Sequence, residues 1–255
     1  MSVNYEKKDH LVILTMDRPD KLNAIDEDML TSLRDSWKRY RDDDDAWIAI
    51  LTGTGKAFCA GADKNWFDKA LRGESSPEAF FKLTSKDPYW SGQLDKPVIT
   101  AVNGLAVGAG LDLALRGDLR IAAESAYFQQ PEVERGTFML FHDNLPGAMA
   151  AEMTAGFRIS AKRAYEVGMV NRLVPDKDVM DAAMQMAGEM LTKVPLALQH
   201  ALRVLREMRK SGTTVPYKLI DHYAAILSKD LMNTDDFKEA TTALLKKKKP
   251  VFKKR

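Results

Sequence analysis

The sequence has little cysteine, since Cys59 is the single cysteine among 255 residues. A disulfide within one chain is therefore impossible, which argues against a secreted disulfide scaffold and favours a reducing compartment. No apolar run approaches the roughly 18–20 residues of a membrane-spanning helix. The N-terminus carries Glu6, Lys7 and Lys8 before its first apolar run, unlike a signal peptide. We therefore expect a cytoplasmic protein with no membrane partner.

Common cofactor signatures are missing as well. The chain has no G-x-x-x-x-G-K-[ST] phosphate loop and no G-x-S-x-G nucleophile turn. The pair Gly53 and Gly55 lacks the third glycine of a dinucleotide fingerprint, because Phe58 stands there. The four histidines have no metal-ligand spacing, and one cysteine cannot form a thiolate cluster. These absences predict a protein without a bound metal or redox cofactor.

Charge is unevenly distributed along the chain. The formal net charge is +2, but residues 246–255 contain seven basic residues and no acid, so the remainder is mildly acidic. A nucleic-acid-binding protein usually presents a broad basic face instead. The basic tail is therefore either a local anion site or a solvated run, and no nucleic-acid partner is expected.

The arrangement of apolar residues predicts an α/β fold. Short Val- and Ile-rich runs bounded by Gly, Pro or Asp indicate buried strands at Leu11–Met16, Trp47–Thr52, Pro97–Val102 and Leu119–Ala122. Helical stretches between them favour mostly parallel pairing. Beyond Ser160 the pattern becomes mainly helical, with helices expected over 161–167, 179–194, 196–211, 215–227 and 234–247. We divide the chain into a core over 1–190 and a helical region with the basic tail over 191–255.

Two turns rich in small residues follow predicted strands. One spans Lys56–Asp63 and the other Ala101–Asp112. Small side chains let backbone N–H groups approach a ligand, and two N–H groups that converge on one oxygen form an oxyanion hole. Tight packing of a helix on a strand requires the same residues, so each turn alone leaves both interpretations open.

Two carboxylates accompany the second turn. Asp112 ends it, and Glu132 follows the next predicted strand. An acid in an apolar setting is costly unless it is paired or functional. Two acids beside an oxyanion hole suit proton transfer next to a carbonyl.

At this point the chain resembles the crotonase (enoyl-CoA hydratase/isomerase) superfamily. The matching pieces, in order, are Asp17-Arg18-Pro19 with Leu22-Asn23-Ala24, Lys56–Asp63, Lys96–Asp112, Gln130-Pro131-Glu132, Arg158-Ile159-Ser160-Ala161, Gly168-Met169-Val170-Asn171 and Thr234-Asp235-Asp236. The resemblance implies a spiral of β-β-α turns with a helical C-terminal region that mediates homotrimers, often stacked as hexamers.

The resemblance also implies an acyl-CoA thioester as the ligand, with coenzyme A carried on the substrate and no separate cofactor. The N–H groups of Ala62 and Ala109 would hold the thioester oxygen, although most relatives have glycine where Ala109 stands. Asp112 and Glu132 would be the catalytic carboxylates. The residues expected to border the substrate or its CoA part are Ala24, Ala60, Asp63, Lys64, Trp66, Gly108, Leu140 and Lys247. Lys247 would reach the phosphates of a CoA that is bound in a neighbouring subunit.

The sequence departs from the family pattern at two places. Hydratases of the usual type carry Glu where Asp112 stands, and Asp is shorter by one methylene. Dienoyl-CoA isomerases carry Asp there, but they place a further Asp where this chain has Leu140, which weakens that alternative. The segment 137–147 replaces a Pro-Gly-x-Gly-Gly-Thr-type turn near the acyl end. With the nearby aromatic residues it predicts an unusual acyl group, bulky or cyclic.

The sequence thus favours an acyl-CoA hydratase that adds water reversibly to a 2-enoyl-CoA through a stabilised enolate. An isomerase that uses Glu132 alone is the nearest alternative. A C–C hydrolase or lyase of the same superfamily would draw on His142 or Asp143. A non-catalytic acyl-CoA-binding relative is the alternative from a different class.

Overall fold

The structure is a computed structural model that describes residues 2–74, 84–136, 145, 147–210, 226 and 228–254. Three of the expectations above fall wholly or mostly outside this set: Leu140, the segment 137–147 and the helix over 215–227. His142 and Asp143 also lie outside the described residues.

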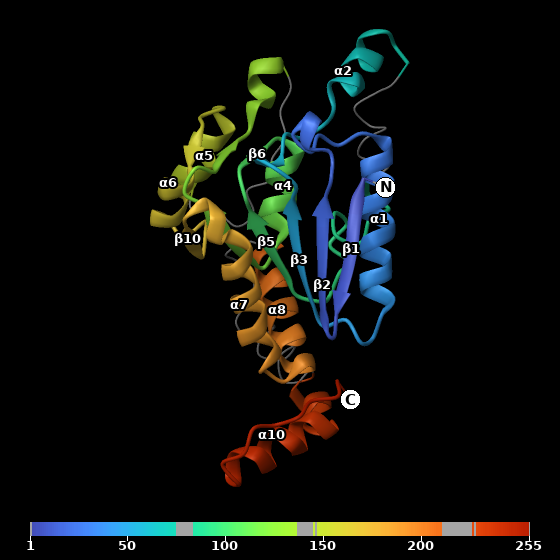
Figure 1. Ribbon diagram of the computed structural model, residues 1–255, viewed down its shortest axis with the longest axis vertical. Coiled ribbons are helices and arrows are strands. Elements are labelled where there is room, and N and C mark those ends of the chain that lie inside the picture. Colours follow the sequence, from blue (N-terminus) through green and yellow to red (C-terminus); the bar gives the residue numbers. More distant parts are fainter. Residues whose placement is uncertain are drawn as a thin grey trace.

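One large sheet forms the centre of the molecule (Figure 1). Its strands, in spatial order, are β1 (Val3–Lys8), β2 (Leu11–Met16), β3 (Ile48–Gly53), β5 (Val98–Val102), β7 (Leu119–Ala123) and β10 (Arg172–Val174). β1 and β2 form an antiparallel hairpin, while the pairs from β2 to β10 are parallel. The strands predicted from the Val- and Ile-rich runs are confirmed, as is the mostly parallel pairing.

A second, smaller sheet gives the fold its repeat. It contains β4 (Ala57–Cys59), β6 (Leu105–Val107), β8 (Tyr127–Gln129) and β9 (Ile159–Ser160). The chain passes from β3 to β4 and then to helix α2 (Lys64–Leu71), and likewise from β5 to β6 and then to α4 (Ala109–Arg116). Each pass adds one strand to each sheet before a helix. This repeated β-β-α turn confirms the predicted spiral.

The remaining helices cover the sheets and form the C-terminal region. They are α1 (Glu27–Asp42), α5 (Gly147–Thr154), α6 (Ala161–Glu166), α7 (Val179–Leu191), α8 (Pro195–Lys210) and α10 (Asp235–Leu245), with the short 3-10 helices η1 (Pro19–Lys21), η2 (Pro131–Arg135) and η3 (Asp176–Asp178). α1 begins where the Asp26 carboxylate accepts the N–H of Met29, and it buries an apolar face that includes Leu33 and Trp37. No helix among the described residues is both long and apolar enough to cross a membrane.

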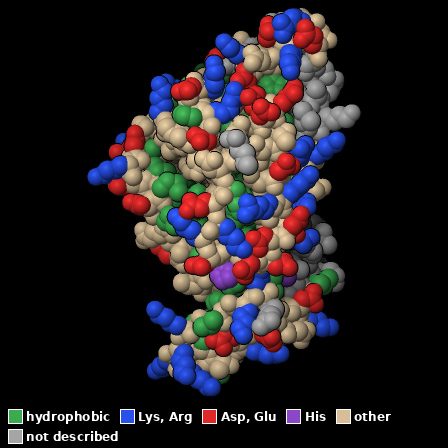
Figure 2. Space-filling model, turned by 45° about the vertical axis from the view of Figure 1, so that its right-hand side comes forward, with side chains coloured by type: hydrophobic (Ala, Val, Ile, Leu, Met, Phe, Trp, Pro, Cys, Tyr) green, Lys and Arg blue, Asp and Glu red, His purple; other side chains and the backbone are tan. Residues whose placement is uncertain are grey.

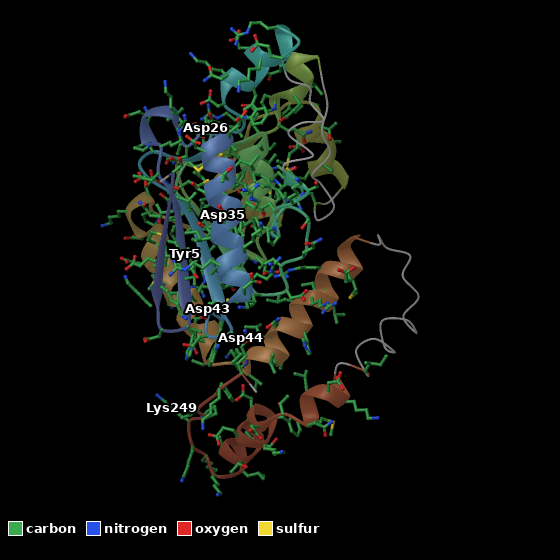
Figure 3. All side chains as sticks on the ribbon, turned by 90° about the vertical axis from the view of Figure 1, so that its right-hand side faces the viewer. Tyr5, Asp26, Asp35, Asp43, Asp44 and Lys249 are labelled. Carbon is green, nitrogen blue, oxygen red and sulfur yellow. The ribbon has the colours of Figure 1, made fainter. Side chains whose placement is uncertain are left out.

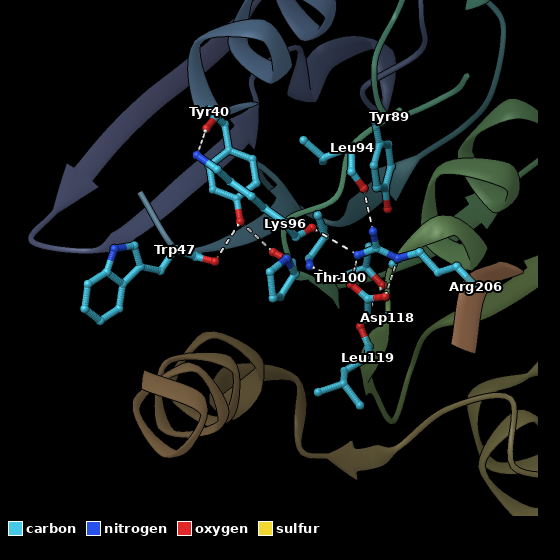
Figure 4. Close-up of polar contacts among 12 residues, drawn as sticks. Tyr40, Trp47, Tyr89, Leu94, Lys96, Thr100, Asp118, Leu119 and Arg206 are labelled. Atoms are coloured by element: carbon cyan, nitrogen blue, oxygen red, sulfur yellow. Dashed lines mark hydrogen bonds and ion pairs between the residues drawn. The ribbon is translucent and has the colours of Figure 1, made fainter. Parts of the chain in front are cut away.

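A buried ion pair fastens α8 to the large sheet (Figure 4). The Arg206 guanidinium donates to both carboxylate oxygens of Asp118, from Nε at 2.7 Å and from Nη2 at 2.6 Å. Its Nη1 and Nη2 also donate to the carbonyl oxygens of Leu94 and Lys96. The Asp118 side chain is only 4% exposed. The Arg206 side chain therefore connects the C-terminal region to the segment that leads into β5.

Candidate active site

The first small-residue turn is held in place by Ile25. The Ile25 N–H donates to the Gly61 carbonyl oxygen at 2.8 Å, and its own carbonyl oxygen accepts from the Asp63 N–H at 2.8 Å. Ile25 and Ala62 thus form a parallel bridge. Because neighbouring peptide groups of an extended segment point to opposite sides, the Ala62 N–H points away from Ile25.

The second turn places a helix start beside the first. Gly108 is the N-cap of α4, so Ala109 contributes the first N–H of the helix, which has no intrahelical partner. A Cβ built on Gly61 would lie 3.4 Å from the Ala109 nitrogen, which shows how closely the two turns approach. A Cβ on Gly110 would overlap the Cys59 carbonyl oxygen. The small residues therefore serve tight packing, and that packing brings the Ala62 and Ala109 region together as an oxyanion hole requires.

Glu132 reaches this point from the next turn of the spiral. It lies on η2, directly after β8, and β8 pairs with β6 so that the Gly108 N–H donates to the Gln129 carbonyl oxygen at 3.0 Å. A Cβ on Gly108 would lie 2.8 Å from Glu132 Oε1. The Glu132 side chain is buried, with 8% of the residue exposed. The structure thus sets this carboxylate against the start of α4.

Asp112 lies one helical turn further along α4, which corresponds to about 5.4 Å along the helix axis. It is 4% exposed. Its carboxylate accepts from Trp90 Nε1 at 2.5 Å and from Arg116 Nε at 2.9 Å. The side chain of the sequence-predicted Asp112 is therefore fixed by an indole and a guanidinium, and neither of these partners was predicted.

An outer group of predicted residues surrounds Ile25. The Arg18 guanidinium donates to the Ala24 carbonyl oxygen at 2.5 Å and lies 3.3 Å from the Asp63 carboxylate. The Ala60 N–H donates to the Leu22 carbonyl oxygen at 3.0 Å, and Trp66 Nε1 donates to the Ile25 carbonyl oxygen at 3.1 Å. Lys64 is exposed at the start of α2. The structure therefore brings Ala24, Ala60, Asp63 and Trp66 together, with Lys64 at the rim.

Lys247, in contrast, lies far from these residues within its own chain. Lys254, seven residues later, donates from Nζ to the Asp44 carbonyl oxygen at 3.1 Å, just beyond the C-terminal end of α1. The turn with Ala62 lies at the opposite end, where α1 begins after Ile25. Figure 3 shows Asp26 at one end of α1, with Asp44 and Lys249 at the other. The 16 residues of α1 separate the two ends by about 24 Å.

Asn23 and Asp87 were missed by sequence reasoning. The Asn23 amide donates to the carbonyl oxygens of Thr54 and Ala57, and its Oδ1 accepts the Arg18 N–H, so it fixes the entry to β4. Asp87 is fully buried and caps the turn that carries Trp90. Its pKa is raised to about 6 because burial disfavours the charged form. The spacing of four residues between Asp112 and Arg116 was the one available signal for their pairing.

Two further groups can be assigned chemically. Cys59 is fully buried, and burial raises the pKa of its thiol to about 12, so the thiol is protonated at neutral pH. Among the described residues there is no group of three or more His, Cys, Asp or Glu side chains that could hold a metal ion. The groups gathered here are two buried carboxylates beside two converging turns, an arrangement suited to proton transfer next to a polarised carbonyl.

We expect Gly108→Ala to lower kcat by about 10- to 100-fold, because its Cβ would displace the Glu132 carboxylate. Steady-state kinetics with a CoA thioester that the wild type converts would measure the change in kcat. The matched control is Gly168→Ala. Gly168 also has a positive φ, +77° against +55° for Gly108, but a Cβ there meets nothing within 4 Å. An equal loss in both variants would attribute the effect to backbone strain and contradict the prediction.

Comparisons with known proteins agree on one family. The model of the family described as enoyl-CoA hydratase/isomerase matches residues 6–255. Carnitinyl-CoA dehydratase from Salmonella paratyphi B is 33% identical over 272 residues, covering 100% of this chain and 99% of that protein. An enoyl-CoA hydratase/isomerase structure from Mycobacterium paratuberculosis has a TM-score of 0.86 at 30% identity, covering 100% and 99% of the two chains. An enoyl-CoA hydratase structure from Bacillus anthracis has a TM-score of 0.88 at 27% identity, with full coverage of both.

Proposed function

The chain belongs to the enoyl-CoA hydratase/isomerase family, the crotonase superfamily, and from this premise we propose that it is an acyl-CoA hydratase. It would add water reversibly across the double bond of a 2-enoyl-CoA thioester. The single observation that carries the proposal is the placement of two buried carboxylates at the start of α4: Glu132 lies against its N-cap, Gly108, and Asp112 lies one helical turn further along.

The oxyanion hole would supply the largest electrostatic contribution. The N–H groups of Ala62 and Ala109 would bind the thioester oxygen, where negative charge develops as the enolate forms. Ala109 begins a helix, and the positive end of the helix dipole adds to this stabilisation. The methyl group of Ala109 leaves its N–H unchanged, so the departure from glycine preserves this role.

The contacts of the two carboxylates suggest different roles. Asp112 accepts from Arg116 and Trp90, and a carboxylate held by a cation and an N–H donor is a poor proton acceptor. It would orient the attacking water as a fixed acceptor. Glu132 would take a proton from that water as the oxygen bonds to C3, and would deliver a proton to C2. Water is thereby added with no external acid, base, metal or redox cofactor.

The outer group would bind the coenzyme A part of the substrate. Ala24, Ala60, Asp63, Lys64 and Trp66 line the side of the site that faces α2. Of these residues, Trp66 also lines a cavity of about 240 Å³ between the starts of α1 and α2, together with Asn65, Lys69 and three acidic residues of α1 and its N-cap. Coenzyme A would arrive and leave as part of the thioester.

The basic tail would act on a neighbouring subunit. Lys and Arg side chains gather at the end of the molecule where α10 and the tail lie (Figure 2). Because α1 separates this end from the turns of the same chain, Lys247 would reach CoA phosphates only in a second copy, as in a homotrimer or hexamer. We expect Lys247→Ala to raise KM for CoA thioesters about 3- to 10-fold with kcat unchanged. Lys162→Ala, at an exposed position of α6, serves as the control, and size-exclusion chromatography would report the assembly. An unchanged KM would contradict the assignment.

An isomerase is the second candidate, because the contacts of Asp112 with Arg116 and Trp90 would leave acid–base chemistry to Glu132 alone. In that case Glu132 would move a proton between two carbons without adding water. The acyl group is a separate question. The aromatic residues near the site favour a bulky acyl group, whereas the carnitinyl-CoA dehydratase relatives direct attention to a polar, cationic one.

The test is a panel of 2-enoyl-CoA thioesters with short, long, aromatic and cyclic acyl groups, together with carnitinyl-CoA in the dehydration direction. Loss of the conjugated-thioester absorbance is followed, and product masses are determined. A product heavier by one water establishes hydration, and the preferred acyl group follows from the panel. An isomeric product of unchanged mass would replace the hydratase with the isomerase. Binding without turnover of any thioester would favour the non-catalytic alternative.

A further inference from the structure

We propose that Arg116 is a positioning residue that fixes the Asp112 carboxylate, with Trp90 as the second donor. This inference rests on the proposed function, because it concerns how Asp112 would orient the water. It also explains how an aspartate, shorter than the usual glutamate, can hold a defined position.

The first step is the geometry around Asp112. Arg116 Nε donates from the next turn of α4 at 2.9 Å. Trp90 Nε1 donates at 2.5 Å, from a different segment. Two donors that approach from different elements restrict the rotation of a carboxylate more than either one does alone, and charge-assisted hydrogen bonds are the strongest of this kind.

The second step is the rigidity of Trp90. Asp87 Oδ1 accepts the N–H groups of Tyr89 at 2.8 Å and of Trp90 at 3.1 Å, which fixes the turn. The Tyr89 hydroxyl donates to the carbonyl oxygen of Leu113 at 2.9 Å, and its ring stacks on Trp37 with centroids 4.4 Å apart. The turn is therefore fastened to α4 at the residue after Asp112. The Trp90 indole is thus placed by its own supports.

The third step is charge. Two acids lie near Arg116: Asp112 on its own helix and Asp87 from the turn. The guanidinium lowers the pKa of Asp87, but burial raises this pKa by more. Among the described residues, Tyr89 from the turn and Arg34 from α1 are further titratable or charged groups that act on this cluster, and Glu132 from η2 lies at the start of the same helix. Removing the guanidinium would leave neighbouring buried acids without its charge. An ionised Asp112 would then be less favourable, and a protonated carboxyl would present a donor to the water instead of an acceptor.

The test compares Arg116→Met, Arg116→Lys and Trp90→Phe with the wild type, on the best thioester of the panel. We expect Arg116→Met to lower kcat about 10- to 100-fold with KM within threefold. The acid limb of its pH profile for kcat/KM should move to higher pH by at least one unit. Arg116→Lys keeps the charge and should keep the wild-type profile with a partial loss of kcat. Trp90→Phe should lower kcat with a smaller shift of the acid limb than Arg116→Met, because it removes a neutral donor and keeps the charge of Arg116.

A second readout follows the clamp without turnover. The chain has four tryptophans, and the Trp90→Phe variant identifies the indole N–H signal of Trp90 in a nitrogen-15 NMR spectrum. The chemical shift of that signal should change with pH as Asp112 is protonated. Asp112→Asn should abolish this pH dependence, and Arg116→Met should move its midpoint to higher pH. A purely structural ion pair would alter thermal stability but leave the pH profile in place.

The control is Arg72→Met. Arg72, directly after α2, pairs with Asp68 of that helix at the same four-residue spacing, but both side chains are more than half exposed. It should change neither kcat nor the pH profile. A wild type that turns over thioesters while Arg116→Met keeps its kcat and pH profile would overturn this inference and leave the hydratase intact. A wild type that turns over no thioester would refute the proposed function itself.

Discussion

The Glu132→Gln variant is expected to lose about 10²- to 10⁴-fold in kcat, the range associated with a general acid–base group. Gln has nearly the same size and can occupy the same buried place against Gly108. It cannot accept a proton from water or deliver one to C2. KM should change little, because the amide leaves the contacts of the thioester and of the CoA part in place. The loss of thioester absorbance measures the effect.

The matched control for this variant is Glu134→Gln. Glu134 lies on the same short helix η2, two residues away, but it is exposed, and its Oε1 accepts from Gln129 Nε2 at 3.3 Å. It should retain the wild-type kcat. If Glu132→Gln kept more than a third of the wild-type kcat, Glu132 would not be the acid–base group, and Asp112 would have to carry proton transfer despite its contacts with Arg116 and Trp90.

Sequence patterns led to this candidate site because its parts lie at the ends of predicted strands. The two small-residue segments follow β3 and β5 and contain β4 and β6, and parallel strands bring such ends to one side of the fold. The pairing of β6 with β8 then brings Glu132 to the start of α4, the helix that carries Asp112. This part of the site follows from local composition and from strand order.

The support of Asp112 could not be predicted in the same way. Trp90 and Asp112 are 22 residues apart, and their contact depends on how the turn capped by Asp87 packs on α4. Tyr89 and Trp90 of this turn are buried, and Trp90 donates to Asp112. Side-chain packing between distant segments decides such contacts, and periodicity carries no information on it.

Three short strands of the smaller sheet were also missed. β4, β6 and β8 have three residues each, too few to distinguish a strand from a turn by alternation. β1, which was not predicted, is one edge strand of the large sheet, and its last three residues, Glu6, Lys7 and Lys8, are all charged. Charged side chains are common on edge strands because they discourage pairing with another chain.

The largest expected effect on stability is that of Arg206→Met, which should lower the free energy of unfolding by about 3–5 kcal/mol. The substitution removes the two guanidinium donors to the Asp118 carboxylate, whose charge stays buried. The Val98 N–H would still donate to this carboxylate, at 2.8 Å in the wild type. Adding Asp118→Asn should recover part of the loss, because a neutral amide is less costly to bury and still accepts the Val98 N–H. Urea unfolding followed by circular dichroism, on the assembled protein at fixed concentration, would measure these values.

Arg203→Met on the same helix is the control, since Arg203 and Asp95 are 3.4 Å apart with both side chains more than 40% exposed, and its loss should be within about 1 kcal/mol. Equal losses in the two variants would show that α8 is held by its apolar face, and that the pair of Arg206 with Asp118 contributes no more than a surface ion pair.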